Sequence, residues 1–363
     1  MQRFAAGNYM KARASGCRGG MRGNMITIAV DGMGGDNAPG CMVQGAVEAL
    51  EQSNEIQIRL LGIPERLEEE LKQYSYDKSR LEIIPASEVI ATEEPPVEAI
   101  KKKKDSSLVR GLNMVRTGEA DALVTCGSTG ATLVGGQVLA GKIKGVRRTP
   151  LAPLIPTVNG VTLLVDCGAN VDARATDLVQ FAQMGSIYME NVLGVKNPRV
   201  GIINIGAEEE KGNALVKEAF PLLKACEGIN FIGSVEAREI PYGACDVLVT
   251  EAFVGNVILK LYEGVGMALI KEIKNAMYSS TRGKVGGLLV KPSLKGVVKK
   301  FDASEYGGAP LLGLKGLVVK AHGSSKAKEV KNAILQCVTF KEQRIAEKIE
   351  TCLKNESRPA EAK

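Results

Sequence analysis

The sequence predicts an α/β protein with three layers, in which helices cover both faces of a mostly parallel sheet. Three observations support this prediction. From residue 25 onward, short runs rich in β-branched and apolar residues alternate with helical stretches. Several of these runs are continuously apolar, as expected of strands that helices bury on both faces. The chain has 363 residues, of which 45% are hydrophobic and 24% are charged, and this composition favours a large core over intrinsic disorder.

Nine segments are predicted to be strands because each is short, rich in β-branched residues and bounded by glycine or polar residues. Helical stretches lie between them, such as 64–74, which has an acid-rich first turn, and 175–193. Because no linker divides the chain, we expect a single large α/β catalytic domain over 25–363. In chain order the predicted strands are 25–33, 56–62, 81–87, 120–127, 160–168, 199–206, 229–235, 245–252 and 316–323.

The first 24 residues differ from the rest in composition. They contain five bases and no acid, and they lack the continuous apolar core of a secretory signal, so we expect a disordered basic leader. The other 339 residues carry 42 bases and 41 acids. The net charge of +6 therefore comes almost entirely from the leader, and the body of the protein offers no field that would favour nucleic acid.

Residues 264–302 are predicted to form an amphipathic helical hairpin. The stretch 271–300 has eight bases and one acid, Glu272, and apolar residues such as Ile270 and Ile273 recur at helical spacing. Such a segment can lie on an anionic membrane or hold an acidic protein. It can equally be a hairpin with a solvated basic face and an apolar dimer seam, and both interpretations can hold together.

The pattern of cysteine and histidine argues against several classes of site. None of the eight cysteines has C-x-x-C spacing, and His322 is the only histidine, so a zinc cage and a disulfide framework both lose support. Apolar neighbours of Cys126, Cys167 and Cys245 indicate buried thiols in a reducing cytosol. The dinucleotide signature G-x-G-x-x-G does not follow the first strand. We therefore expect no metal and no cofactor.

Polar and glycine-rich loops follow the predicted strands, at the edge of the sheet where ligands of open α/β proteins bind. The first loop, 31–40, contains Asp31 and Asp36 among close glycines, and 126–131 combines glycine with hydroxyl groups at a helix start. A tight turn or a helix cap could explain each loop singly. Together they offer many donors and few nucleophiles, which suits an anion such as phosphate that itself attacks an acyl carbonyl. The remaining loops are 166–177, 204–213, 250–260, 305–313 and 321–328.

Several of these stretches resemble one known family. VDGMGGDNAP, LLVDCGANVD, INIGAEEEKGN, FVGNVILK and AHGSSKAKEVKNAI are similar to segments of the bacterial phosphate acyltransferases of phospholipid synthesis, in the same order from about Met25 to about Ile349. The resemblance implies a fold akin to phosphotransacetylase and isocitrate dehydrogenase. It implies transfer of a long-chain acyl group from acyl carrier protein to inorganic phosphate. It also implies a cytoplasmic homodimer on the membrane surface, whose acyl phosphate product feeds a membrane glycerol-3-phosphate acyltransferase.

By position in the matching motifs, Lys211 and Asn256 are the expected catalytic residues: Lys211 would neutralise phosphate or the oxyanion, and Asn256 would orient one of them. Three positions depart from the family pattern: Asn37 stands where histidine is common, Ser128 replaces an asparagine, and Glu251-Ala252 replaces Asp-Gly. The expected phosphate-binding residues are Gly34, Gly35, Asp36, Ser128, Thr129, Asp166, Asn170, Asn204, His322 and Ser324.

Two other functions stay open. The first is short-chain acyl transfer from coenzyme A, and the second is a non-catalytic scaffold for acyl carrier protein or membrane. The basic, apolar hairpin favours a long acyl chain and an acidic carrier, because a small thioester needs neither. The presence of both Lys211 and Asn256 favours an enzyme over a scaffold.

Overall fold

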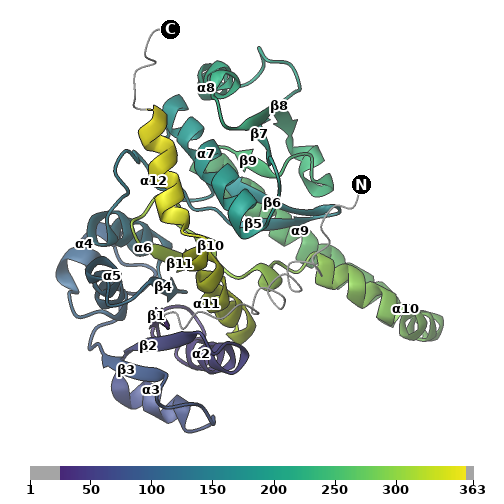
Figure 1. Cartoon of the computed structure of the whole chain (residues 1–363). Helices are drawn as coiled ribbons and strands as arrows, with labels where there is room; N and C mark the ends of the chain where they lie inside the picture. Colours follow the sequence, from purple (N-terminus) through teal and green to yellow (C-terminus); the bar gives the residue numbers. More distant parts are fainter. Residues whose placement is uncertain (1–24, 357–363) are drawn as a thin grey trace.

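A computed structural model describes residues 25–356 and confirms the α/β class, with helices packed on both faces of mostly parallel strands (Figure 1). All nine predicted strands are present. Two short strands were missed, and both pair antiparallel at the edge of a sheet: β5 (Leu154–Thr157) and β10 (Ala309–Pro310). Each has four residues or fewer, too short for a clear alternating pattern. The predicted leader lies outside the described residues.

The strands form two sheets, which the sequence analysis did not separate because β-propensity does not say which strands pair. The first sheet has the order β10-β11-β4-β1-β2-β3, and the second has the order β5-β6-β9-β7-β8. The first sheet contains β1 (Ile26–Asp31), β2 (Ile56–Gly62), β3 (Leu81–Pro85), β4 (Ala122–Thr125) and β11 (Leu317–Lys320). The second contains β6 (Gly160–Val165), β7 (Arg199–Asn204), β8 (Asn230–Glu236) and β9 (Val247–Val249).

Helices bury both faces of the first sheet. In β1, Ile28 and Val30 belong to one apolar cluster and Ala29 to the other, as the alternation of a strand requires. The first apolar cluster includes side chains of α2 (Gly40–Gln52) and α11 (Ala327–Glu342), whereas the second apolar cluster includes those of α5 (Ser107–Thr117). The other helices of this half are α3 (Pro64–Leu71), α4 (Pro96–Lys102) and α6 (Thr129–Gly135) with its π-helical extension Gly136–Ala140.

The second sheet is built in the same way. Leu163 and Val165 of β6 pack in the first apolar cluster with Phe181 of α7 (Ala175–Val192), and Leu164 belongs to the second apolar cluster. Both apolar clusters therefore contain residues of both sheets. Figure 1 shows α12 (Ile345–Glu356) beside α7, while α8 (Ala214–Ala225) lies at the far end of the second sheet. Short 3₁₀ helices occupy Ala237–Tyr242 and Ala303–Tyr306.

The predicted hairpin is present as two helices, α9 (Ala252–Tyr278) and α10 (Thr281–Lys300), and its first helix begins before the expected residue 264. In Figure 1, α10 and the end of α9 project away from both sheets. Several of their apolar side chains are more than 60% exposed, among them Leu261, Met267, Leu288 and Leu289. Within residues 25–356, α9 is the one helix that is long and apolar enough to cross a membrane. A single helix that meets this criterion is weak evidence of a membrane span.

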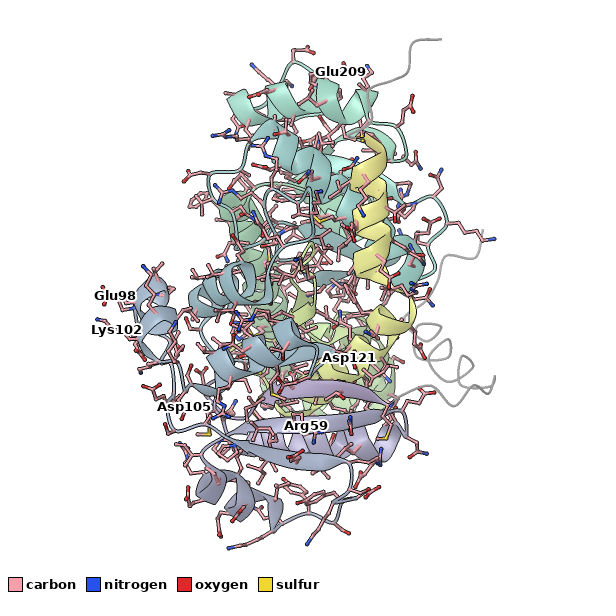
Figure 2. All side chains as sticks on the ribbon, turned by 60° about the vertical axis from the view of Figure 1, so that its left-hand side comes forward. Arg59, Glu98, Lys102, Asp105, Asp121 and Glu209 are labelled. Atoms are coloured by element: carbon pink, nitrogen blue, oxygen red, sulfur yellow. The ribbon has the colours of Figure 1, made fainter. Side chains whose placement is uncertain are left out.

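The segment 149–152 joins the two sheets. The amide of Ala152 donates to Pro310 O, which belongs to β10, and Leu151 N donates to the carboxylate of Asp166, directly after β6. Since Ala309 pairs with Lys320 at the end of β11, this segment lies close to the carboxyl ends of strands from both sheets. Exposed ion pairs such as Glu98 with Lys102 lie on the outer surface instead, as Figure 2 shows.

Candidate active site

The carboxyl ends of β1, β4 and β11 bring three of the predicted loops together. The amide of Asp36 donates to Gly323 O at 2.8 Å, and Asn37 Nδ2 donates to Ser324 O and Ser325 O at 3.1 Å each. We call this group the first cluster. It contains seven of the ten residues expected to bind phosphate: Gly34, Gly35, Asp36, Ser128, Thr129, His322 and Ser324.

Within the first cluster the side chains differ in what they can offer a ligand. Ser128 is buried and caps α6 by accepting from Ala131 N at 3.4 Å, whereas Thr129 is exposed. His322 Nδ1 lies 2.8 Å from Ser324 Oγ, so these two exposed side chains pair with each other. Asp36 is an exposed carboxylate, which repels an anion, whereas its backbone amide donates to Gly323 O.

A small pocket opens beside the first cluster. Its polar lining comes from Asp31, Ser107 and Ser128, and its apolar lining includes Ile90 and Leu108. Asp31 is 2% exposed, and its Oδ2 accepts from Thr125 Oγ1 at 2.7 Å. Burial raises the pKa of Asp31, and hydrogen bonds from Ser107, Thr125 and the Met33 amide oppose this shift.

The sequence analysis missed Lys320, which lies at the end of β11 and is 6% exposed. Its Nζ donates to Cys126 O at 3.3 Å and also to Ala321 O. Burial lowers the pKa of this ammonium group, and the nearby Asp31 and Asp36 oppose that shift. The available signal was a charged residue in the otherwise apolar strand segment GLVVKA, since lysine is rarely buried without a reason.

The second cluster lies at the carboxyl ends of β6 and β9 and contains Asp166, Asn170 and Asn256. Asp166 is fully buried, and its Oδ1 accepts from the amides of Leu151, Gly168 and Ala169 at 2.9 to 3.1 Å. Its Oδ2 accepts from both nitrogens of Asn170 at 2.8 Å. The amides of Gly168, Ala169 and Asn170 in this loop therefore donate to the loop's own carboxylate. Burial raises the pKa of Asp166.

Asn256 is fastened to the same loop through the first turns of α9. Glu251 caps this helix by accepting from Phe253 N at 2.6 Å and Val254 N at 2.9 Å. Gly255 then packs so closely on the loop that a Cβ atom there would lie 1.9 Å from Asp166 O. The next residue is Asn256, whose Nδ2 donates to Cys167 O at 3.0 Å. The helix starts four residues before Asn256, so Asn256 is not its N-cap.

Lys211 lies on the loop after β7, next to β9 in the second sheet. Asn204 shapes this loop, since its Nδ2 donates to Lys211 O at 3.1 Å and its Oδ1 accepts from Ile205 N at 2.8 Å. The Lys211 side chain is 47% exposed, and its Nζ lies 2.8 Å from a carboxylate oxygen of Glu208. The hydrogen bond that Lys211 donates to Glu208 raises the pKa of Lys211, so the group is a cation at neutral pH.

The structure thus brings the expected residues together in groups rather than in a single contact network. Lys211 and Asn256 follow neighbouring strands of the second sheet and share its carboxyl edge. Among residues 25–356, no hydrogen bond or ion pair links the first cluster to Lys211 or to the second cluster. Segment 149–152 touches both edges, with Leu151 N on Asp166 and Leu312 N on Pro150 O.

The predicted burial of three cysteines is confirmed. Cys126, Cys167 and Cys245 are at most 2% exposed, and burial raises the pKa of Cys126 and of Cys245 to about 12 each. They are neutral thiols at physiological pH, which makes them poor nucleophiles. In the part of the chain that the structure describes, no group of three or more histidine, cysteine, aspartate or glutamate side chains could hold a metal ion.

Comparisons with known proteins match most of the chain. A family model described as "Fatty acid synthesis protein" matches residues 26–348. A phosphate acyltransferase of Clostridium acetobutylicum is 51% identical over 324 residues, which cover 89% of this chain and 98% of that protein. A phosphate acyltransferase of Clostridium botulinum is also 51% identical, over 330 residues and 98% of its length.

Solved structures resemble this fold at much lower sequence identity. A phosphotransacetylase of Staphylococcus aureus superposes with a TM-score of 0.59 at 18% identity, covering 93% of this chain and 99% of the other. A phosphotransacetylase of Streptococcus pyogenes gives a TM-score of 0.60 at 16% identity, covering 92% and 99%. These likenesses confirm the expected phosphotransacetylase-like fold.

Proposed function

The chain belongs to the fatty acid synthesis protein family and is a phosphate acyltransferase, and we propose that its acyl donor is a long-chain thioester of acyl carrier protein. The observation that carries the activity is the 51% identity to phosphate acyltransferases over nearly their whole length. The donor is proposed because the projecting hairpin exposes both bases and large apolar side chains, which suit an acidic carrier and a long acyl chain.

In the proposed reaction an oxygen of inorganic phosphate forms a bond to the thioester carbonyl carbon. The carbon–sulfur bond then breaks, which leaves acyl phosphate and the carrier's thiolate, and the thiolate takes up a proton to become a thiol. Phosphate supplies the nucleophile, so the protein's task is to hold the anion and to stabilise the oxyanion that develops on the carbonyl. The neutral buried cysteines are not needed as nucleophiles.

We assign the cation of this site to Lys211 and a positioning amide to Asn256. Support comes from the shared edge of the second sheet, from the exposed ammonium group of Lys211, and from the bond that fixes Asn256 on the loop after β6. A cation there would neutralise phosphate or the oxyanion. The first cluster, with Gly34, Gly35 and Ser128, is proposed to hold the phosphate from the other sheet, across segment 149–152.

We further propose that the enzyme is a cytoplasmic homodimer that associates peripherally with membrane, where its product would serve a membrane glycerol-3-phosphate acyltransferase. The supporting feature is the hairpin of α9 and α10, whose apolar side chains are unpacked in a single chain. Large exposed apolar surfaces of this kind mark protein or membrane contacts. The six bases of α10, which has no acid, favour an anionic surface.

The activity is tested with purified protein, palmitoyl carrier protein and inorganic phosphate, with acyl phosphate trapped by hydroxylamine. We expect turnover that depends on phosphate, and faster turnover with the carrier thioester than with acetyl coenzyme A. Thioester hydrolysis that ignores phosphate would contradict the proposed reaction. Preference for acetyl coenzyme A would contradict the proposed donor while leaving phosphate as the acceptor.

The membrane proposal is tested by flotation with liposomes that contain or lack anionic lipid. Ile270, at helical spacing on α9, is 43% exposed, so Ile270→Glu adds a charge where an acyl layer would lie without disturbing the core. We expect the unchanged protein to float with anionic liposomes and the variant to float less. Flotation that responds neither to lipid charge nor to this substitution would contradict membrane contact through the hairpin.

A further inference from the structure

Lys320 is a buried cation whose role the proposed reaction does not include. It ends β11, the strand next to β4, and its ammonium group donates to the carbonyls of Cys126 and Ala321. These carbonyls belong to the first residues after β4 and β11, where the chain leaves the sheet. One side chain therefore joins the two turns that carry Ser128 and His322.

Lys320 is part of a continuous network at the first cluster. Thr125 Oγ1 donates to Asp31 Oδ2 at 2.7 Å and accepts from Gly127 N at 2.9 Å, which ties the ends of β1 and β4. The amide of Ala321 donates to Thr125 O at 2.9 Å, which ties the ends of β4 and β11. Through these bonds Asp31, Thr125 and Lys320 determine how the three turns sit relative to one another.

The close packing of these turns makes their relative position sensitive. A Cβ atom at Gly34 would lie 2.7 Å from Gly127 N, and one at Gly35 would lie 2.7 Å from Cys126 Cβ. There is no free space to absorb a shift of the turn after β4 toward the turn after β1. Loss of the ammonium group would release the carbonyl of Cys126 and so allow this turn to move.

Burial of a charge in this place needs compensation. Removing the charge of a lysine from water is unfavourable unless charged or polar partners surround it. Here the partners are two carbonyls and the nearby carboxylates of Asp31 and Asp36. An apolar residue of similar length would fill the same space at lower cost, and therefore fold stability by itself does not call for lysine at this position.

We propose that Lys320 is a positioning residue for phosphate binding, which holds the turns after β1, β4 and β11 in the arrangement that receives the anion. This inference rests on the proposed function, because it assumes that the first cluster binds phosphate. It assigns Lys320 no contact with phosphate. The residue acts through the backbone of Cys126 and Ala321.

The test is steady-state kinetics of Lys320→Met, which keeps the length of the side chain and removes the charge. We expect the KM for phosphate to rise roughly 10- to 100-fold, as for a binding group displaced by about 1 Å, while the KM for the acyl donor changes less than about twofold. Lys331→Met is the matched control, since Lys331 lies on α11 and forms a partly exposed ion pair with Glu48 at 3.4 Å. This control should keep both KM values.

A second variant covers the case in which the single one fails to fold because it leaves the Asp31 charge buried and unpaired. Lys320→Met combined with Asp31→Asn removes both charges, so we expect it to fold and to keep the raised KM for phosphate. A phosphate KM within about twofold of the parent enzyme, in either folded variant, would overturn the inference. An equal rise in both KM values would also overturn it, since it would indicate general loosening. Absence of acyl phosphate with the parent enzyme would instead contradict the proposed function.

Discussion

Lys211, which we propose as the cation of the site, is not a buried residue. Its ammonium group is half-exposed and paired with Glu208 on its own loop, an arrangement that many surface lysines share. What distinguishes it is its place at the carboxyl edge of the second sheet, next to the strand that leads to Asn256. A neighbouring lysine, Lys224, forms a similar ion pair with Glu209 at 2.7 Å and serves as a control.

We predict that Lys211→Ala lowers kcat/KM by about 10²- to 10³-fold, the usual loss when one charge-stabilising donor is removed. The fold should persist, because the side chain is 47% exposed and its ion-pair partner Glu208 lies on the same loop. Acyl phosphate formation measures the first effect and thermal unfolding the second. Lys224→Ala should keep near-normal activity. A fully active Lys211→Ala enzyme would remove Lys211 from the mechanism.

A second prediction at the residue scale concerns Asp105, which Figure 2 labels between α4 and α5. Its carboxylate accepts from Ser87 Oγ at 2.6 Å, from Ser87 N at 2.9 Å and from Arg110 at 2.8 Å. These bonds, chiefly those from Ser87, lower the pKa of Asp105 from 3.8 to about 2. Folding therefore favours the charged form, so the stabilisation is present above about pH 4 and is lost as the pH falls toward 2.

We predict that Asp105→Asn lowers the free energy of unfolding at pH 6 by about 1 kcal/mol or less, because solvent screens a side chain this exposed. The difference from the parent protein should shrink at pH 3.5, and urea unfolding at the two pH values measures it. Glu98→Gln is the control, since Glu98 pairs with Lys102 in an exposed i,i+4 arrangement on α4. A difference for Asp105→Asn that grows in acid would contradict the sign.

At the scale of elements, the start of α9 is the part of the site that depends most on one residue type. Gly255 lets the helix approach the loop after β6 until its backbone touches Asp166 O. This approach places Asn256 within hydrogen-bonding distance of Cys167 O. The same helix contains Gly264, where a Cβ atom would meet nothing within 4 Å.

We predict that Gly255→Ala destabilises the protein by about 2 kcal/mol or more, because an overlap of this size forces the helix away from the loop. It should also reduce activity by displacing Asn256. Gly264→Ala in the same helix should be neutral, or should stabilise by about 0.5–1 kcal/mol through helix propensity. Chemical unfolding compares the two variants. Equal stability of both would show that the close contact at Gly255 is not retained in solution.

At the scale of the whole molecule, Asp166 connects the two halves. Its carboxylate binds the amide of Leu151, in the segment that lies between the sheets, and three amides of the loop after β6. The first cluster belongs to one sheet and Lys211 to the other, so their separation depends on this junction. We interpret Asp166 as an organiser of the site rather than as a phosphate ligand.

We predict that Asp166→Asn destabilises the protein by about 2–4 kcal/mol, because the new NH2 group cannot accept from the buried amides that the carboxylate oxygens serve. Activity should fall in the fraction that remains folded. Asp172→Asn, at an exposed position of the same loop, should change stability by no more than about 0.5 kcal/mol. Urea unfolding checks both variants, and an Asp166→Asn protein as stable as its parent would contradict the role of the junction.

The sequence by itself determined the class of the fold, the nine main strands and the helical hairpin. These depend on local patterns: apolar runs of strand length, helical spacing of apolar residues, and glycine where a strand ends. The motifs around Lys211 and Asn256 also sufficed to indicate the family. The predicted carboxyl end of the sheet is also where Ser128 and Asn204 lie: Ser128 stands between β4 and α6, and Asn204 is the last residue of β7.

Only the tertiary structure decided which groups meet. The division into two sheets, the five bonds to Asp166 and the burial of Lys320 depend on pairings between residues far apart in the chain, such as Lys320 with Cys126. The sequence does not distinguish a lysine whose ammonium group faces water from one whose ammonium group donates to two buried carbonyls. The desolvation that separates these cases arises only when distant strands pack, and local residue patterns do not record it.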